Sequence, residues 1–172
     1  MKRRTALFVG AAAAAGGAGV GVALWRSRPA APALPADFWT LRFERPEGGE
    51  LALAALRGKP TLLNFWATWC APCVKELPLL DRFQRDQAAR GWQVIALAID
   101  SPTPVREFLR QRPLGLAVGL AGLTGVDLTR ALGNSQGALP FTVVFDAGGV
   151  PRERKLGAVE PGELAAWARD IL

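Results

Sequence analysis

Two cysteines, Cys70 and Cys73, are the only thiols in this chain of 172 residues, and Ala71 and Pro72 separate them. Thiols at this spacing can close a disulfide and open it again, which permits thiol–disulfide exchange. A purely structural disulfide is a weaker explanation, because closing so short a loop stabilises a fold by only roughly 2 kcal/mol. The chain has no histidine and no second cysteine pair, which excludes a zinc site and any Cys–His or Ser–His catalytic pair. The pair therefore predicts a redox centre without a metal.

The predicted elements around the cysteines place them at the start of a helix. Thr61–Trp66 is a short apolar run typical of a strand buried on both faces, and Val74–Arg90 has a helical pattern of apolar residues. A helix N-terminus presents free N–H groups and the positive end of the helix dipole, which favour a thiolate at Cys70. Cys73 lies one turn further along. We therefore expect Cys70 to attack a substrate disulfide and Cys73 to resolve the mixed disulfide that forms.

Predicted strands and helices alternate along the chain and are followed by a hairpin and a last helix. Turns at 46–49 and 146–149 predict an N-terminal and a C-terminal β-hairpin, and basic residues in the last strand indicate an exposed sheet edge. The expected strands are 38–45, 50–53, 61–66, 92–99, 115–118, 141–145 and 150–156, and the expected helices are 74–90, 104–112, 127–132 and 161–172. This order predicts a three-layer α/β fold with a central mixed β-sheet.

The start of the chain has the pattern of a signal or membrane-anchor segment. Basic residues at 2–4 are followed by a charge-free stretch at 5–25, about 20 residues, which is long enough to span a bilayer. An uncleaved anchor, a signal cleaved near 31–33 and a twin-arginine signal all fit, and each predicts an exported domain. The expected parts of the chain are an N-terminal signal/membrane-anchor segment at 1–28, a Pro/Ala linker at 29–36 and a folded domain at 37–172.

The net charge of +6 belongs mostly to this leader. Residues 1–33 contain five basic residues and no acidic one, which leaves 16 basic against 15 acidic residues in the rest of the chain. The domain is therefore close to neutral and has no basic stripe with interleaved aromatic residues. This pattern excludes nucleic-acid binding.

The segment from Phe65 to Pro78, with the sequence FWATWCAPCVKELP, resembles the active-site segment of the TlpA/ResA-type thioredoxins. The resemblance covers roughly residues 36–172 and implies a thioredoxin-like fold. It implies an exported or membrane-tethered enzyme on the periplasmic side of the inner membrane that reduces protein disulfides, in some members for cytochrome c or oxidase biogenesis. It also implies a disulfide-containing exported protein as substrate, a membrane thiol reductant as electron donor, and no small-molecule cofactor.

Further site residues come from this resemblance. Glu76 matches a glutamate used near the cysteines, and Asn64 stands where cytoplasmic thioredoxins have a buried aspartate. Pro78 matches a proline that kinks the active-site helix. Leu139 and Pro140 resemble the cis-proline loop that faces the cysteines, where the Leu139 backbone would pair with a substrate strand.

Trp69 and Pro72 complete the expected substrate groove beside Cys70. A solvated helix carboxylate remains the alternative for Glu76, and Asp81 and Asp100 are expected to be surface carboxylates.

Other functions of the same pair of thiols stay open. The protein could oxidise thiols instead of reducing disulfides, or it could carry copper on two thiolates, although such carriers usually add histidine or methionine and the one Met is Met1. A peroxidase is excluded because Cys70 lacks the Pro-x-x-x-Thr-x-x-Cys loop of that chemistry.

Overall fold

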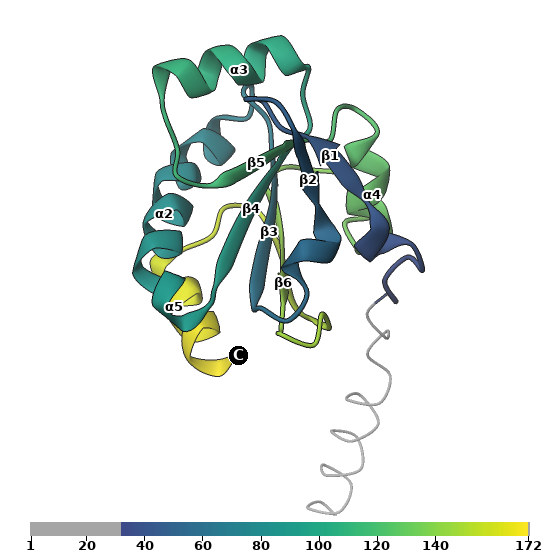
Figure 1. Ribbon diagram of the computed structural model, residues 1–172, viewed down its shortest axis with the longest axis vertical. Coiled ribbons are helices and arrows are strands. Elements are labelled where there is room, and N and C mark those ends of the chain that lie inside the picture. Colours follow the sequence, from purple (N-terminus) through teal and green to yellow (C-terminus); the bar gives the residue numbers. More distant parts are fainter. Residues whose placement is uncertain (1–31, 172) are drawn as a thin grey trace, which may run out of the picture. The chain divides into compact units, whose positions relative to one another are not determined.

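The computed structural model describes residues 32–171, and the predicted signal or anchor segment at 1–28 lies outside them (Figure 1). Its strands are β1 (Arg42–Glu44), β2 (Glu50–Ala52), β3 (Thr61–Trp66), β4 (Gln93–Ala98), β5 (Ala117–Leu120), β6 (Phe141–Phe145) and β7 (Pro151–Leu156). Its helices are α2 (Ala71–Gln87), α3 (Pro102–Gln111), α4 (Gly125–Ala131) and α5 (Pro161–Asp170), with 3-10 turns η1 (Phe38–Thr40), η2 (Leu53–Leu56) and η3 (Ala88–Arg90). None of the helices between residues 32 and 171 combines the length and apolar composition needed to cross a membrane.

The strands join in one sheet in the order β2-β1-β5-β4-β3-β6-β7. β3, β4 and β5 are parallel neighbours, whereas β6 runs antiparallel to β3 and β7 antiparallel to β6. β1 and β2 form the predicted N-terminal hairpin. The mixed sheet and both hairpins are therefore confirmed, and β7 lies at one edge, as its basic residues indicated.

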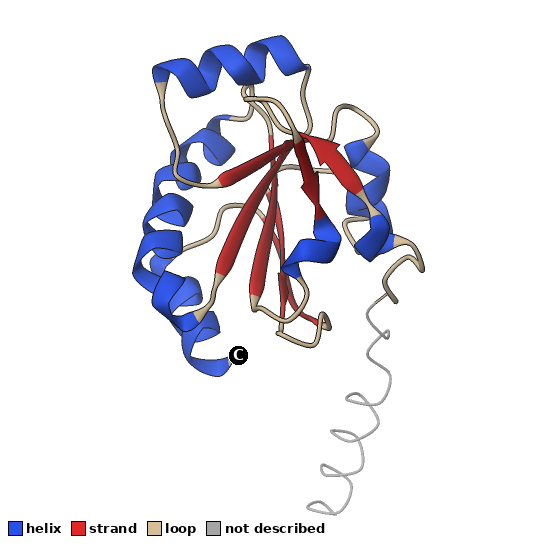
Figure 2. Ribbon diagram, viewed as in Figure 1, coloured by secondary structure: helices blue, strands red, loops and turns tan. Residues whose placement is uncertain are grey.

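Both faces of the sheet are covered by packed residues. Alternate residues of a central strand point to opposite sides, so β3 contributes to a core on each face. Leu62 and Trp66 of β3 pack in a core with residues of α2, α3 and α5. Leu63 and Phe65 pack in a second core with residues of η1, η2 and α4. Figure 2 shows the helices on either side of the strands. The predicted three-layer α/β fold is confirmed.

The active-site helix begins earlier than the sequence predicts. α2 starts at Ala71, three residues before the expected start, because Cys70 caps it and Pro72 suits its first turn. The helix continues through Pro78 to Gln87. The cysteine pair therefore lies at the helix N-terminus, as predicted, and Cys73 belongs to the helix itself.

Two predicted strands are shorter or displaced. The segment expected to begin the first strand forms η1, because Phe38 is buried and its ring stacks on Phe145. β5 begins at Ala117 rather than at residue 115, and the N–H of Gly115 donates to the Asp81 carboxylate instead of to a neighbouring strand. Contacts with residues far away in the sequence therefore explain why both elements differ from the prediction.

The carboxyl ends of β3 and β4 and the start of β6 meet at one edge of the sheet. β3 and β4 are parallel, and Phe65 near the end of β3 pairs with Phe141 at the start of β6. Loops 67–70, 99–101 and 138–140 therefore leave the sheet at the same edge. α2 begins from the first of these loops, so this edge carries the predicted redox pair.

Candidate active site

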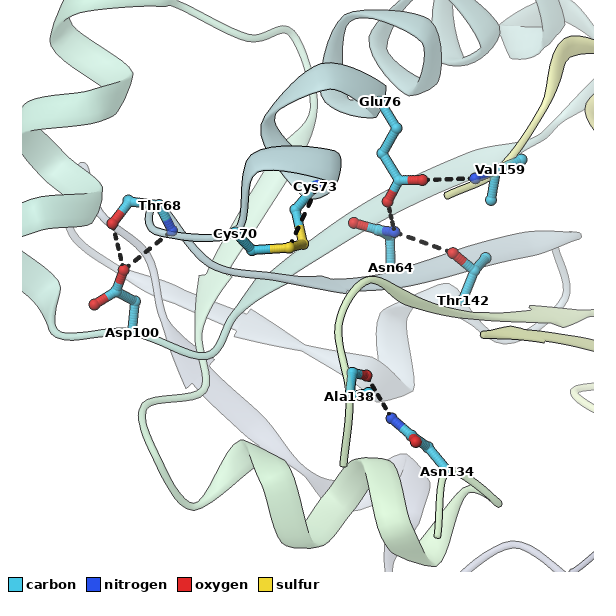
Figure 3. The surroundings of a disulfide bond; sticks show 10 residues. All are labelled: Asn64, Thr68, Cys70, Cys73, Glu76, Asp100, Asn134, Ala138, Thr142 and Val159. Atoms are coloured by element: carbon cyan, nitrogen blue, oxygen red, sulfur yellow. Dashed lines mark hydrogen bonds between the residues drawn. A yellow bond between two sulfur atoms is a disulfide. The ribbon is translucent and has the colours of Figure 1, made fainter. Parts of the chain in front are cut away.

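Cys70 and Cys73 are joined by a disulfide, with their Cα atoms 5.3 Å apart (Figure 3). Cys70 is the N-cap residue of α2, and its Sγ accepts a hydrogen bond from the Cys73 N–H at 3.4 Å. Cys73 is fully buried, whereas Cys70 keeps 6% of its area exposed. Of the two, Cys70 is therefore the residue that a partner can approach from solvent.

Exposed residues flank Cys70 in the chain. Trp69 has 68% of its area exposed, an unusual value for so large an apolar side chain. Ala71 and Pro72 are also exposed. We call Trp69, Ala71 and Pro72 the collar of Cys70. It offers exposed apolar side chains next to Cys70 in the chain.

Glu76 points from α2 into the domain, and only 3% of its area is exposed. Its Oε1 accepts a hydrogen bond from Asn64 Nδ2 at 2.7 Å, and its Oε2 accepts one from the Val159 N–H at 2.7 Å. Asn64 lies fully buried on β3 and also donates to Thr142 Oγ1 at 3.0 Å. The alternative that Glu76 is a solvated helix carboxylate is therefore wrong.

Burial raises the pKa of Glu76 above its ordinary value of 4.5, and the hydrogen bonds from Val159 and Asn64 oppose that effect. Glu76 follows Cys73 by three residues, so both side chains lie on one face of α2. A carboxyl group with a perturbed pKa is a candidate functional group on physical grounds.

The Leu139–Pro140 peptide bond is cis, as the family resemblance implied. Pro140 is buried and Leu139 is half-buried. The preceding residue, Ala138, is held by Asn134, whose Nδ2 donates to the Ala138 carbonyl oxygen at 2.8 Å (Figure 3). The loop at 138–140 is thus tied down by a buried amide that the sequence analysis did not single out. The only signal in the sequence was the position of Asn134 directly after Gly133, because asparagine side chains in turns often form hydrogen bonds with the nearby backbone.

A family model described as Redoxin matches residues 33–170. The chain belongs to the Redoxin family. Thiol-disulfide oxidoreductase ResA of Bacillus cereus is 31% identical to this Redoxin over 126 residues, which are 73% of this chain and 70% of that protein. ResA of Geobacillus thermodenitrificans is 31% identical over 127 residues, with the same coverage of both chains. The relatives place the chain with the ResA/TlpA-type proteins that its active-site segment resembles.

Solved structures show that the fold is thioredoxin-like. A thiol:disulfide interchange protein of the thioredoxin family from Chlorobium tepidum TLS is 26% identical, with a TM-score of 0.64 over 83% of this chain and 95% of that one. The structure of MTB dsbF is 21% identical, with a TM-score of 0.66 over 80% and 98% of the two chains. With its cysteine pair in place, this Redoxin is a thiol–disulfide oxidoreductase, the enzyme class of its ResA relatives.

Two aspartates of this Redoxin are not the surface carboxylates that the sequence predicts. Asp100 is 7% exposed and Asp81 9% exposed. Asp81 pairs with Arg85 and accepts from the Gly115 N–H at 2.8 Å. Asp100 accepts three hydrogen bonds, two of them from Thr68 in the loop before Cys70. Carboxylates can be buried when backbone N–H groups satisfy them, and residue type alone does not reveal those donors.

Between residues 32 and 171, no three cysteine or acidic side chains are grouped so that they could hold a metal ion. The chemistry that these residues offer is exchange at sulfur. The capped and approachable Cys70, the shielded Cys73 and the buried carboxyl of Glu76 all lie within two turns at the start of α2. The loop at 138–140 leaves the sheet at the same edge.

Proposed function

We propose that this Redoxin reduces disulfides of exported proteins, with Cys70 as the attacking thiolate and Cys73 as the resolving thiol. One observation carries the order of the two roles. Cys70 caps α2 beside an exposed collar, whereas Cys73 is fully buried one turn behind it. Only the first sulfur can meet a substrate disulfide, and only the second stays close enough to release the product.

The proposed cycle starts from the dithiol form. The Cys70 thiolate attacks one sulfur of the substrate disulfide, that bond breaks, and the other substrate sulfur leaves as a thiolate. The Cys73 thiol then loses its proton and attacks the Cys70 sulfur, and the second substrate sulfur leaves. Two electrons have passed to the substrate, and the protein carries the Cys70–Cys73 disulfide.

Glu76 is proposed to take part in the second step. The Cys73 thiol is buried and has to give up a proton before it can attack. Glu76 lies on the same helix face, and its raised pKa allows the carboxylate to accept that proton near neutral pH more readily than an exposed glutamate. The hydrogen bonds from Asn64 and Val159 hold the carboxyl group in place.

The substrate is proposed to lie along the edge formed by the collar and the cis-proline loop. Trp69 and Pro72 offer apolar contact on the side of α2. Leu139, half-buried just before β6, would pair its backbone with an extended substrate strand, and the buried Pro140 would keep that backbone facing the cysteines. Recognition would then depend on an extended segment around the substrate cysteine.

We further propose that residues 1–28 export or anchor the domain on the periplasmic side of the inner membrane, with 29–36 as linker and 37–172 as the domain. The oxidised enzyme must regain two electrons after each cycle, and a membrane thiol reductant is the proposed donor. Disulfides of proteins in cytochrome c or oxidase biogenesis are the proposed substrates. The charge-free stretch at 5–25 with its basic start, and the likeness to ResA, support these assignments.

The reduction potential of the cysteine pair tests the direction of the reaction. The purified full-length protein is equilibrated in thiol buffers of known potential, and free thiols are counted by alkylation. A value of about −250 mV or lower is expected for a reductant. A value near about −120 mV would make the protein a disulfide donor and overturn the proposed direction.

A further inference from the structure

The carboxylate of Asp100 joins the loop before α2 to the loop after β4. One of its oxygens accepts from the backbone N–H of Thr68 at 3.1 Å and from the Thr68 hydroxyl at 2.5 Å (Figure 3). The other oxygen accepts from the Ser101 N–H at 2.7 Å. Because Asp100 is only 7% exposed, water competes weakly for these bonds.

This contact holds the turn that leads into Cys70. The Cys70 N–H donates to the Ala67 carbonyl at 3.2 Å, which closes a turn around Thr68 and Trp69. The Trp69 side chain is largely exposed and so does not anchor the turn in the interior. The Thr68 hydroxyl and N–H instead hold the turn against Asp100 in the loop after β4. Figure 3 shows this contact on one side of the disulfide and Glu76 on the other.

We propose that Asp100 is a positioning residue for Cys70 and acts through Thr68. This inference rests on the proposed function, in which Cys70 is the attacking thiolate. Free N–H groups in the first turn of α2, including that of Cys73, stabilise a Cys70 thiolate only while its Sγ stays at the capping position. In the reduced protein no disulfide holds the sulfur there, so the turn has to do so. The Asp100 carboxylate accepts hydrogen bonds from Thr68 and Ser101 and not from a cysteine, so its proposed effect on Cys70 is indirect.

Variants of Thr68 test the position of the turn before Cys70 separately from the charge of Asp100. Thr68→Val keeps the shape of the side chain and removes its hydroxyl, while the Asp100 charge stays. Thr68→Ser keeps the hydroxyl and removes a methyl group. Asp81→Asn is the matched control, because Asp81 is a second buried carboxylate that binds a backbone N–H, on a part of α2 beyond the cysteines.

The test measures alkylation of Cys70 by iodoacetamide against pH in full-length Cys73→Ser protein, where Cys70 is the sole thiol. With Thr68→Val added, we expect the rate near neutral pH to fall about threefold to tenfold, the scale of one ordinary hydrogen bond. At high pH, where every thiol is ionised, the rate should stay within about twofold of the parent. Thr68→Ser should restore the parent profile, and Asp81→Asn should leave it unchanged even where it lowers the melting temperature.

A double-mutant cycle tests whether the effect passes through Asp100. One Asp100 oxygen accepts both Thr68 hydrogen bonds, so the variant that breaks the contact has to remove both oxygens, as Asp100→Ala does. We therefore expect Thr68→Val to slow alkylation less in the Asp100→Ala background than in the parent. An equally large effect in both backgrounds would overturn the role of Asp100.

Three other results would also overturn the inference: a parent-like profile for Thr68→Val, a Thr68→Ser profile as slow as that of Thr68→Val, or an equal slowing by Asp81→Asn. These results differ from a failure of the proposed function. If Cys70 in the Cys73→Ser protein reacted no faster near neutral pH than cysteine in a short peptide, the assignment of Cys70 as nucleophile would fall. If Cys70 is alkylated rapidly and Thr68→Val does not change that rate, the assignment of Cys70 as nucleophile stands.

Discussion

The Glu76 carboxyl group accepts a hydrogen bond from the Asn64 side-chain amide at 2.7 Å, and both residues are buried between α2 and β3. An amide can donate to a carboxylate without titrating itself, so one proton site is placed near the cysteines rather than two. Of this pair only Glu76 can titrate, so no second titratable group complicates the protonation of this contact.

Glu76→Gln should change how stability depends on pH. Burial raises the Glu76 pKa, so the folded state keeps this proton to a higher pH than the unfolded chain does. The stability from this group is complete below its ordinary value of 4.5 and is lost as the pH rises through the raised pKa. Relative to that of the parent, the free energy of unfolding of the variant should therefore rise as the pH increases from 4.5 through the raised pKa, by about 1.4 kcal/mol for each unit of raised pKa. Urea unfolding of the oxidised proteins measures this difference.

Glu163→Gln is the matched control with the opposite sign. The hydrogen bond from Lys155, at 2.7 Å, is the main cause that lowers the Glu163 pKa. Its contribution to stability is present above 4.5 and is lost as the pH falls through the lowered pKa. The free energy of unfolding of Glu163→Gln should thus fall relative to that of the parent as the pH rises. A pH-independent difference for Glu76→Gln would contradict the raised pKa of Glu76.

Cys73→Ser should trap substrates as mixed disulfides. The attack by Cys70 survives in this variant, but no thiol remains to resolve the product. Disulfide-linked partners should accumulate on non-reducing gels of cells that carry the variant and disappear on reduction. Cys70→Ser is the control and should trap nothing. Equal trapping by both variants would mean that the two cysteines have no fixed order of roles.

Asn64→Asp should destabilise the folded protein in a pH-dependent way. It places a second carboxyl group against that of Glu76, and two carboxylates in contact cannot both ionise cheaply. We expect the free energy of unfolding to fall by about 3 kcal/mol near pH 8 and by less near pH 5. In the Glu76→Gln background part of this pH dependence should vanish, because the repulsion between the two carboxylates is gone while the burial of the new carboxyl group remains. The prediction fails if the loss is the same at both pH values in the parent background.

Trp69→Ala should weaken reduction of protein disulfides more than reduction of a small aromatic disulfide. The indole is exposed, so its loss removes contact area for a polypeptide with little effect on the core. A fall of about threefold to tenfold in the rate with a protein substrate is expected, as for a central apolar contact residue. Val150→Ala is the control, an exposed apolar residue at the far end of the β6–β7 hairpin. Equal losses with both substrates would argue against a recognition role.

The sequence predicted best where local signals agree. β6 was predicted to the residue, since Pro140 limits it on one side and the turn at 146–149 on the other. The start of α2 was missed by three residues, because the helical pattern of apolar residues begins only after the cap. η1 could not be foreseen, because its conformation depends on the stacking of Phe38 on Phe145, over one hundred residues away.

The same distinction applies to the site. The cysteine pair is local and was evident from its spacing, and Glu76 and the cis-proline loop followed from a family resemblance. The buried states of Asp81 and Asp100 were missed, because each carboxylate binds an N–H more than thirty residues away in the chain, that of Gly115 for Asp81 and that of Thr68 for Asp100. Neither the periodicity nor the composition of the sequence indicates such contacts.

The open edges of the sheet have a further consequence for an enzyme proposed to bind extended chains. Any such chain could add as a strand to a free sheet edge and be held unproductively, away from Cys70. β7 presents Arg152, Arg154 and Lys155 along one edge, and β2 at the other edge has only three residues. Both edges are thus poor templates for a further strand. A substrate polypeptide therefore finds no favourable strand partner at either edge, which reduces competition between unproductive binding there and reaction at Cys70.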